Sequence, residues 1–189
     1  MQEARFGFIK RKTTGLFALG VAAAVGCSKE ETPSAVVPTS ASLYGVEMTL
    51  SAHCCEAPAS EANLISEVLS RSVGEDVEFP AIEGSATTQP VIDADVDISE
   101  TAIAITYRGA FFAEAGSFNG YLFQLSGESP VILGAELDAA TNTPEGAVNL
   151  SFTEQSLSVN VSGLSVDVGS RIGIVLDLES EPPATTTTR

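Results

Sequence analysis

The chain has 189 residues, of which 44% are hydrophobic and 6% aromatic, with no tryptophan. This content excludes a wholly disordered chain and leaves room for one domain with a core of Val, Ile, Leu and Phe. The formal net charge is −16, and a surface this acidic repels phosphate backbones, so we expect no nucleic-acid partner.

The first 26 residues have the pattern of a cleaved export signal. Lys10-Arg11-Lys12 precedes an apolar run over 15–25, and small residues lead up to Cys27. A basic start, a short apolar segment and a small-residue exit are typical of a secretory signal. The run is shorter than the roughly 20 residues that a membrane-spanning helix needs. The sequence therefore predicts export.

The ending Ala24-Val25-Gly26-Cys27 resembles the bacterial lipobox. The resemblance implies that Cys27 is acylated, with palmitate among its chains, and becomes the new N-terminus. Several acyl chains anchor a protein stably, whereas one binds only marginally. We therefore expect a lipoprotein of the bacterial cell envelope, bound to the membrane through lipid and facing the periplasm or the exterior. The alternatives are plain secretion after cleavage at the alanines and an uncleaved short anchor.

Composition divides the chain into four parts. Residues 1–26 are the predicted signal peptide, and residues 27–42 are polar, contain Pro and Ser and lack periodicity, which is typical of a flexible tether. Residues 43–179 are the predicted folded domain. The tail over 180–189 contains two prolines and four threonines, and we expect it to be disordered.

Within the domain, apolar residues alternate with polar ones at a period of two, which predicts half-buried strands. Turn residues separate the segments. The expected strands are 46–52, 77–79, 92–98, 103–107, 118–125, 131–137, 148–152, 157–161 and 172–178. Eight or nine short strands with frequent turns predict an all-β antiparallel sandwich, Ig-like or jelly-roll-like, with a closed barrel as the alternative. Residues 64–69 also fit helical spacing, so that stretch is expected to be either a strand or a short edge helix.

Four short phrases carry a second resemblance: Val77-Glu78-Phe79-Pro80, Phe118-Asn119-Gly120-Tyr121, Ser151-Phe152 and Val159-Asn160-Val161-Ser162-Gly163-Leu164. Together they are similar to β-rich domains of exported bacterial proteins, many of which carry a C-terminal PEP-CTERM sorting signal. The likeness spans roughly 46–178 and implies export and a β fold, without transferring any catalytic residue. The tail lacks the hydrophobic helix and basic end of that signal, so the lipid would replace it as the anchor. We interpret Asn119-Gly120 as a tight turn or strand entry.

Asp93, Asp95 and Asp97 form a candidate calcium site. On a strand all three carboxylates share one face, and calcium is bound by several carboxylate oxygens. An EF-hand loop would also need glycine and glutamate where the chain has Ile98 and Ala104. Carboxylates two residues apart on a strand lie about 6.6 Å apart, and the solvated face of a strand explains them equally well. We expect no cofactor, with calcium at these aspartates as the alternative.

His53-Cys54-Cys55 is the second candidate site, and His53 is the only histidine. Neighbouring residues of a strand point to opposite faces, so His53 and Cys54 would diverge and Cys55 would lie on the histidine's side. If Cys27 is lipidated, these two cysteines are the remaining thiols in an oxidising compartment. The alternatives are a vicinal disulfide, thiols that are inert or pair with another chain, and a soft-metal or redox site.

The sequence contains no G-x-S-x-G elbow, Walker loop, HExxH or CxxC motif, so no catalytic residue is assigned. We expect Phe111-Phe112 and Phe118 to pack in the core rather than form a ligand patch. The predicted function is a non-enzymatic structural or binding role, with a protein or glycan partner that the sequence does not specify. The alternatives are a calcium-assisted adhesion or carbohydrate-binding module, and an envelope hydrolase or redox protein that uses His53 and the two cysteines.

Overall fold

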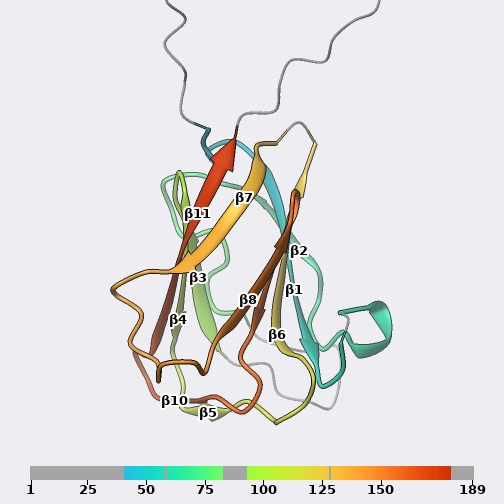
Figure 1. The fold of residues 1–189 in the computed structure, drawn as a ribbon, viewed down its shortest axis with the longest axis vertical. Helices are drawn as coiled ribbons and strands as arrows, with labels where there is room; N and C mark the ends of the chain where they lie inside the picture. The colour runs from blue at the N-terminus through green and yellow to red at the C-terminus, as the bar shows by residue number, and fades with distance from the viewer. Residues whose placement is uncertain (1–40, 58, 83–92, 128, 180–189) are drawn as a thin grey trace, which may run out of the picture. The chain divides into compact units, whose positions relative to one another are not determined.

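The computed structural model of the chain describes residues 41–57, 59–82, 93–127 and 129–179. The predicted signal peptide, most of the tether and the tail lie outside these ranges. Within them, all regular structure is strand except one 3₁₀ turn, η1 (Glu61–Asn63). The strands in chain order are β1 (Glu47–Cys54), β2 (Leu69–Ser72), β3 (Ala94–Ile98), β4 (Ala102–Tyr107), β5 (Phe111–Phe112), β6 (Asn119–Ser126), β7 (Val131–Leu137), β8 (Asn149–Thr153), β9 (Ser156–Asn160), β10 (Ser165–Val166) and β11 (Arg171–Glu179) (Figure 1).

Two antiparallel sheets pack together, which confirms the predicted sandwich. Sheet A has the strand order β2-β1-β6-β9-β8, and sheet B has the order β3-β4-β11-β7. A two-stranded ribbon of β5 and β10 lies at one end (Figure 1). The nine strands of the two main sheets match the eight or nine that were expected. Both sheets end in edge strands, so the described chain forms a sandwich and not the alternative barrel.

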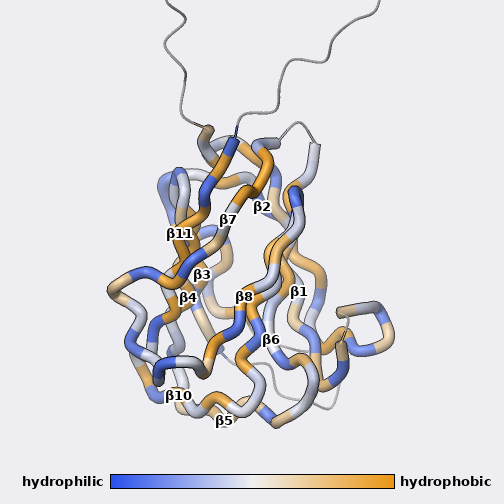
Figure 2. The backbone as a smooth tube through the Cα atoms, viewed as in Figure 1, coloured by the Kyte–Doolittle hydropathy of each residue, from blue (hydrophilic) through white to orange (hydrophobic). Residues whose placement is uncertain are grey.

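Alternation of apolar and polar residues along the strands builds the core between the sheets. Figure 2 shows this alternation as orange and blue bands along the tube. Inward side chains of β1, β6 and β9 meet those of β3, β4 and β11 in one hydrophobic cluster. Its almost fully buried members include Met48, Leu50, Ile98, Ile103, Ile105, Phe123, Leu157 and Ile172. Burial of these side chains is the main term that stabilises the fold.

Two tyrosines, one from each sheet, bring hydroxyl groups into this core. Tyr107 ends β4 and Tyr121 lies in β6, and both are almost fully buried. Burial raises the pKa of both phenols, and the proximity of Tyr107 raises the pKa of Tyr121 further. Both side chains therefore stay neutral throughout the physiological range and serve as large core residues that fill the space between the sheets.

The expected strand at 77–79 is absent, and this prediction is wrong. Only Phe79 joins a sheet, through a single bridge to Val96. The side chain of Glu78 turns into the protein, where its carboxylate accepts hydrogen bonds from the backbone N–H groups of Gly74 (2.8 Å) and Ile98 (2.7 Å). The segment is thus a loop fastened to β3 by an acidic side chain, and the short apolar pattern around it reflects burial of Phe79.

The stretch at 64–69, which fits both helical and strand spacing, runs beside β1. Leu64 forms a bridge with His53, and the N–H of Ile65 donates to the carbonyl of Ala52 (2.9 Å). From Leu69 the segment continues as β2, which pairs with β1 as the edge of sheet A. Within 64–69, only Leu69 belongs to a strand and Leu64 forms an isolated bridge, so the stretch is mostly an irregular segment beside β1. Among the described residues, the one helical turn near it is η1.

The chain enters the sandwich and completes its last strand at the same end. The N–H of Leu43 donates to the carbonyl of Glu100 (2.8 Å), and the N–H of Leu176 donates to the carbonyl of Thr101 (2.7 Å), so both meet the β3–β4 turn. We call this the entry end. β1 runs away from it to Cys54, beside the β5–β10 ribbon at the distal end (Figure 1). Among the described residues, no helix is long and apolar enough to span a membrane.

A partly buried ion pair attaches the loop after β7 to β11. The Arg171 guanidinium donates to both carboxylate oxygens of Asp138 (3.1 and 2.9 Å), and Thr141 and the backbone N–H of Ala140 donate to the same carboxylate. Partial burial alone would raise the pKa of Asp138, but Arg171 and the other donors outweigh it, and the pKa lies below its ordinary value of 3.8. A Cβ at Gly173 would collide with the Asp138 carboxylate.

We expect Asp138→Asn to destabilise the domain by about 1–2 kcal/mol at pH 7, because the variant loses a charge-assisted pair. The side chains of Arg171 and Asp138 are only 31% and 20% exposed, respectively. A carboxyl group whose folded pKa is depressed stabilises above its unfolded pKa and loses this contribution as pH falls through the folded value. The stability difference between wild type and variant should therefore shrink as the pH falls below the ordinary Asp138 value of 3.8. Urea unfolding of wild type and variant between pH 7 and pH 2.5 measures this difference in stability. Asp97→Asn, at an exposed position, is the control. A difference that persists unchanged at the lowest pH would contradict the prediction.

Candidate functional site

The two cysteines at the end of β1 are joined to each other. Cys54 and Cys55 form a vicinal disulfide at the distal end, which is one of the three alternatives drawn from the sequence. The loop between β5 and β6 packs directly against it, since the N–H of Ser117 donates to the carbonyl of Cys55 (3.1 Å). The N–H of Ala57 in turn donates to the Ser117 hydroxyl (2.9 Å). These hydrogen bonds attach the segment that follows the disulfide to the loop between β5 and β6.

Gly116 allows this loop to approach the disulfide. A Cβ at this position would collide with the carbonyl oxygen of Cys55, so only glycine fits without movement of the backbone. The N–H of Gly116 donates to the Ser162 hydroxyl (2.7 Å), and that hydroxyl donates back to the Gly116 carbonyl (2.8 Å). These two hydrogen bonds with Ser162 hold the backbone of Gly116 close to the disulfide.

Two asparagines connect the loop to sheet A. The side-chain oxygen of Asn160 accepts from the N–H groups of Asn119 (3.1 Å) and Ser162 (3.0 Å), and its amide donates to the Ser117 carbonyl (3.1 Å). The Asn119 amide donates to the carbonyl of Glu114 (3.0 Å). These contacts explain why asparagine recurs in two of the phrases quoted above. Both residues order the distal loop, and Asn119 starts β6, as the strand-entry interpretation expected.

Glu114, which the sequence analysis did not single out, lies beside the disulfide. The sulfur atoms of Cys54 and Cys55 and a carboxylate oxygen of Glu114 all lie within 4.8 Å of one another. The Cys55 sulfur is 3.9 Å from Glu114 Oε2. A disulfide sulfur carries no proton, so this is a contact and not a hydrogen bond. No local sequence signal could have identified Glu114, because 59 residues separate it from Cys55 and only the sheet topology brings them together.

His53 is not a member of this group, and both of its ring nitrogens are used elsewhere. Nδ1 lies 3.1 Å from the Ser60 carbonyl and 3.0 Å from the side-chain oxygen of Asn63, which are both acceptors, so Nδ1 carries the proton. Nε2 then accepts from the Ser51 hydroxyl at 2.9 Å. With 4% of its surface exposed, His53 serves to hold the loop around η1 against β1.

The three aspartates of the candidate calcium site lie on β3 or directly before it. Arg108 is within ion-pair distance of Asp93 (3.8 Å) and Asp95 (3.7 Å). Asp95 also accepts a hydrogen bond from the N–H of Ala81 (2.8 Å), whereas Asp97 is exposed. Among the described residues, the three carboxylates do not converge as a group within 4.8 Å. Arg108 therefore balances the negative charge of Asp93 and Asp95, whose side chains are partly buried.

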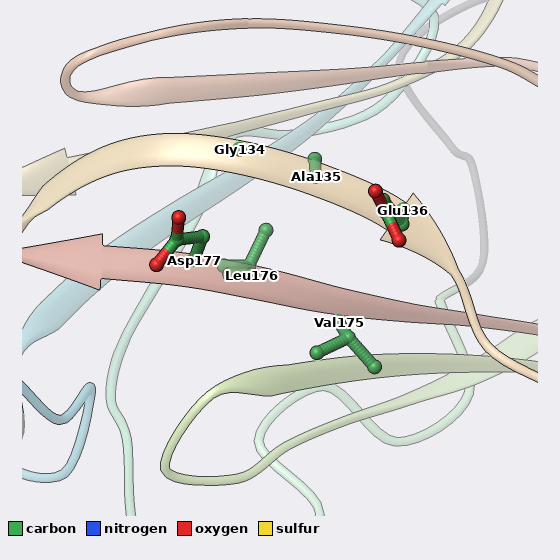
Figure 3. A pocket seen from close by; sticks show the side chains of 6 residues that line it. All are labelled: Gly134, Ala135, Glu136, Val175, Leu176 and Asp177. Carbon is green, nitrogen blue, oxygen red and sulfur yellow. The ribbon is translucent and has the colours of Figure 1, made fainter.

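A shallow hollow on sheet B has two carboxylates, those of Glu136 and Asp177, in its lining. It has a volume of about 400 Å³ and lies between β7 and β11 (Figure 3). It exists because Gly134 and Ala135 carry little or no side chain on an edge strand. Its lining residues are Gly134, Ala135, Glu136, Val175, Leu176 and Asp177. Both carboxylates of this lining, those of Glu136 and Asp177, are exposed to solvent.

The phenylalanines at the distal end divide between core and surface. Phe118 is buried and Phe111 packs against the core, as predicted, but 61% of Phe112 is exposed. Val168, in the turn between β10 and β11, is 72% exposed. The expectation that all three phenylalanines pack inside is therefore wrong for Phe112, because β5 has only two residues and its second side chain points outward.

Comparisons of the chain with protein-family models, with curated proteins and with solved structures find no match. Cys27, the predicted lipidation site, lies outside the described residues. The distal end, with its disulfide, one carboxylate and an ordered loop, is the part of the described chain where chemically distinctive groups gather. It is therefore the candidate functional site.

Proposed function

We propose that this protein is a lipoprotein of the bacterial cell envelope, anchored through lipid on Cys27, whose sandwich presents its distal end as a non-enzymatic binding face. The observation that carries the proposal is the course of β1. The chain enters the domain at one end, and the disulfide, Glu114 and the ordered loop occupy the other. The eight residues of β1 span about 23 Å, so the point where the chain enters the domain and the candidate site lie at opposite ends of the sandwich.

Two further observations support this proposal. A disulfide between Cys54 and Cys55 suits an oxidising compartment outside the cytosol, where structural disulfides persist. Exposed Phe112 and Val168 give the distal end apolar side chains, and aromatic anchors of this kind dominate binding energy in protein interfaces. A binding role is favoured over catalysis because the single histidine is engaged in structural hydrogen bonds through both nitrogens.

The anchor is tested by metabolic labelling with palmitate. We expect the wild-type protein to incorporate label and to fractionate with membranes, and the Cys27→Ser variant to lose the label completely, because the thiol that forms the thioether is gone. Cys54→Ser/Cys55→Ser serves as the control and should retain the label. Label on the Cys27→Ser protein would refute acylation at this position.

The binding face is tested in intact envelopes by replacing single exposed aromatic residues with a photo-crosslinking amino acid. Phe112 at the distal end and Tyr44 at the entry end are a matched pair, 61% and 46% exposed. We expect a discrete cross-linked partner from position 112 and none from position 44. Cross-linking from position 44 alone, or equally from both positions, would contradict a distal binding face.

A further inference from the structure

Cys54, Cys55 and Glu114 combine two sulfur atoms and a carboxylate oxygen at one point of the surface. Among the described residues, they are the only group of three or more histidine, cysteine or acidic side chains whose potential ligand atoms all lie within 4.8 Å of one another. Two elements distant in sequence supply them: the end of β1 and the loop after β5. Tertiary structure therefore creates the cluster, and it is not a by-product of an acidic run.

The loop holds Glu114 in place on both sides. The N–H of Ala113 donates to the Leu164 carbonyl (2.8 Å), and the Ala113 carbonyl accepts from the N–H of Gly163 (3.0 Å). The carbonyl of Glu114 itself accepts from the Asn119 amide (3.0 Å). The backbone that carries the carboxylate is thus ordered before any ligand arrives, which lowers the entropic cost of binding.

Within the described ranges, no cationic side chain forms an ion pair with the Glu114 carboxylate. All three arginines of the described chain have partners elsewhere: Arg108 pairs with Asp93 and Asp95, Arg171 with Asp138, and Arg71 donates to the Ser70 carbonyl. His53 is held by its own hydrogen bonds. Two ionised thiols beside Glu114 would bring three negative charges together, and a bound cation would remove their mutual repulsion.

We propose that Cys54, Cys55 and Glu114 form a redox-gated site for a thiophilic divalent cation, with zinc as its representative. The disulfide form cannot bind, because its sulfur atoms are bonded to each other. A dithiol reductant opens the site by exchange: two electrons and two protons pass to the cysteines, and the reductant becomes a disulfide. The cation then displaces the two thiol protons and is held by two thiolates and one carboxylate, with water as fourth ligand.

The observed spacing suits this coordination. In tetrahedral zinc, with Zn–S near 2.3 Å and Zn–O near 2.1 Å, a sulfur and an oxygen ligand lie about 3.6 Å apart. Cys55 Sγ and Glu114 Oε2 are already 3.9 Å apart, close to this spacing. The two sulfur atoms, once reduction breaks the bond between them, must separate to about 3.8 Å to bind the same ion. The inference rests on the proposed function only in treating the distal end as the binding face. The cation test uses purified protein, so it can fail or succeed independently of the anchor and of the cross-linking result.

The test uses the full chain with Cys27→Ser, which leaves Cys54 and Cys55 as the only thiols. One sample is kept oxidised, and the other is reduced, freed of reductant and handled without oxygen. Zinc chloride is titrated into each by calorimetry, and cadmium is used to detect thiolate charge-transfer absorption. We expect one zinc ion per reduced chain and binding at least 100-fold weaker in the oxidised chain. Equal binding by the two forms would overturn the proposal.

Variants separate the proposed site from general attraction to an acidic surface. In the reduced chain, Glu114→Gln should weaken zinc binding about tenfold or more, since even the residues that orient metal ligands contribute about 10–100-fold to affinity. The exposed Glu136→Gln on β7 should leave zinc binding unchanged. Cys54→Ser/Cys55→Ser should remove it. An unaltered affinity in Glu114→Gln would refute the three-ligand site. Circular dichroism follows folding in each sample, and a reduced chain that binds zinc only when unfolded would also refute it.

Discussion

Gly120→Ala is expected to destabilise the domain by about 2–4 kcal/mol, a loss typical of overpacking against a rigid backbone. Gly120 lies in β6, the middle strand of sheet A, opposite His53 of β1 and Asn160 of β9. A Cβ there would collide with the carbonyl oxygen of Val159 and lie 3.3 Å from the Asn160 Cα. The obstacle is backbone held by hydrogen bonds on both sides, so no side-chain rotation relieves it.

Urea unfolding of the purified chain, followed by circular dichroism, measures this effect. Gly109→Ala is the matched control, because nothing lies within 4 Å of a Cβ built at that position. We expect the control to be neutral or to stabilise by up to about 1 kcal/mol through the unfolded state. A Gly120→Ala protein as stable as the control would show that sheet A yields at this position, contrary to our expectation.

Glu78→Ala is expected to cost about 3 kcal/mol or more, because hydrogen bonds to an ionised group contribute about 1.5–3 kcal/mol each. The Glu78 side chain is 6% exposed and accepts from two backbone N–H groups, those of Gly74 and Ile98. Alanine would leave both donors without their acceptor, one of them at the end of β3. The loop 73–78 would also lose its attachment to sheet B.

The same unfolding measurement tests Glu78 against two comparison variants. Glu78→Gln keeps one of the two acceptor oxygens and should lose about half as much stability. Glu75→Ala changes an exposed acidic residue of the same loop and should stay within about 0.5 kcal/mol of wild type. If Glu78→Ala is no less stable than Glu75→Ala, the carboxylate does not hold the loop in solution.

Period-two alternation predicted most of the two sheets, because half-buried strands must place apolar residues on one face. It identified the central strands β1, β4, β6 and β11 closely. It missed β5 and β10, since two residues are too few to show a period. At Val77-Glu78-Phe79 the pattern was misleading, because the acidic residue expected on a solvated face turned inward to bind backbone N–H groups.

The candidate site was predicted only in part. The adjacent cysteines and the expectation of export to an oxidising compartment led to a vicinal disulfide as one alternative, and strand geometry separated His53 from Cys54. Nothing local could place Glu114 beside them, because its position depends on how β6 pairs with β1. Nor did the phrase Phe118-Asn119-Gly120-Tyr121 reveal the reason for its glycine, which is the approach of the Val159 carbonyl from a neighbouring strand.

Because Leu43 and the last strand both meet the β3–β4 turn, the position at which a reporter is attached determines which end of the domain it labels. A fluorescent protein or epitope fused after β11 would be added at the entry end, where Leu43 begins the domain. It would leave the disulfide end free. An epitope inserted in the β10–β11 turn around exposed Val168 would be displayed at the opposite end, where antibody access would compete directly with any natural ligand.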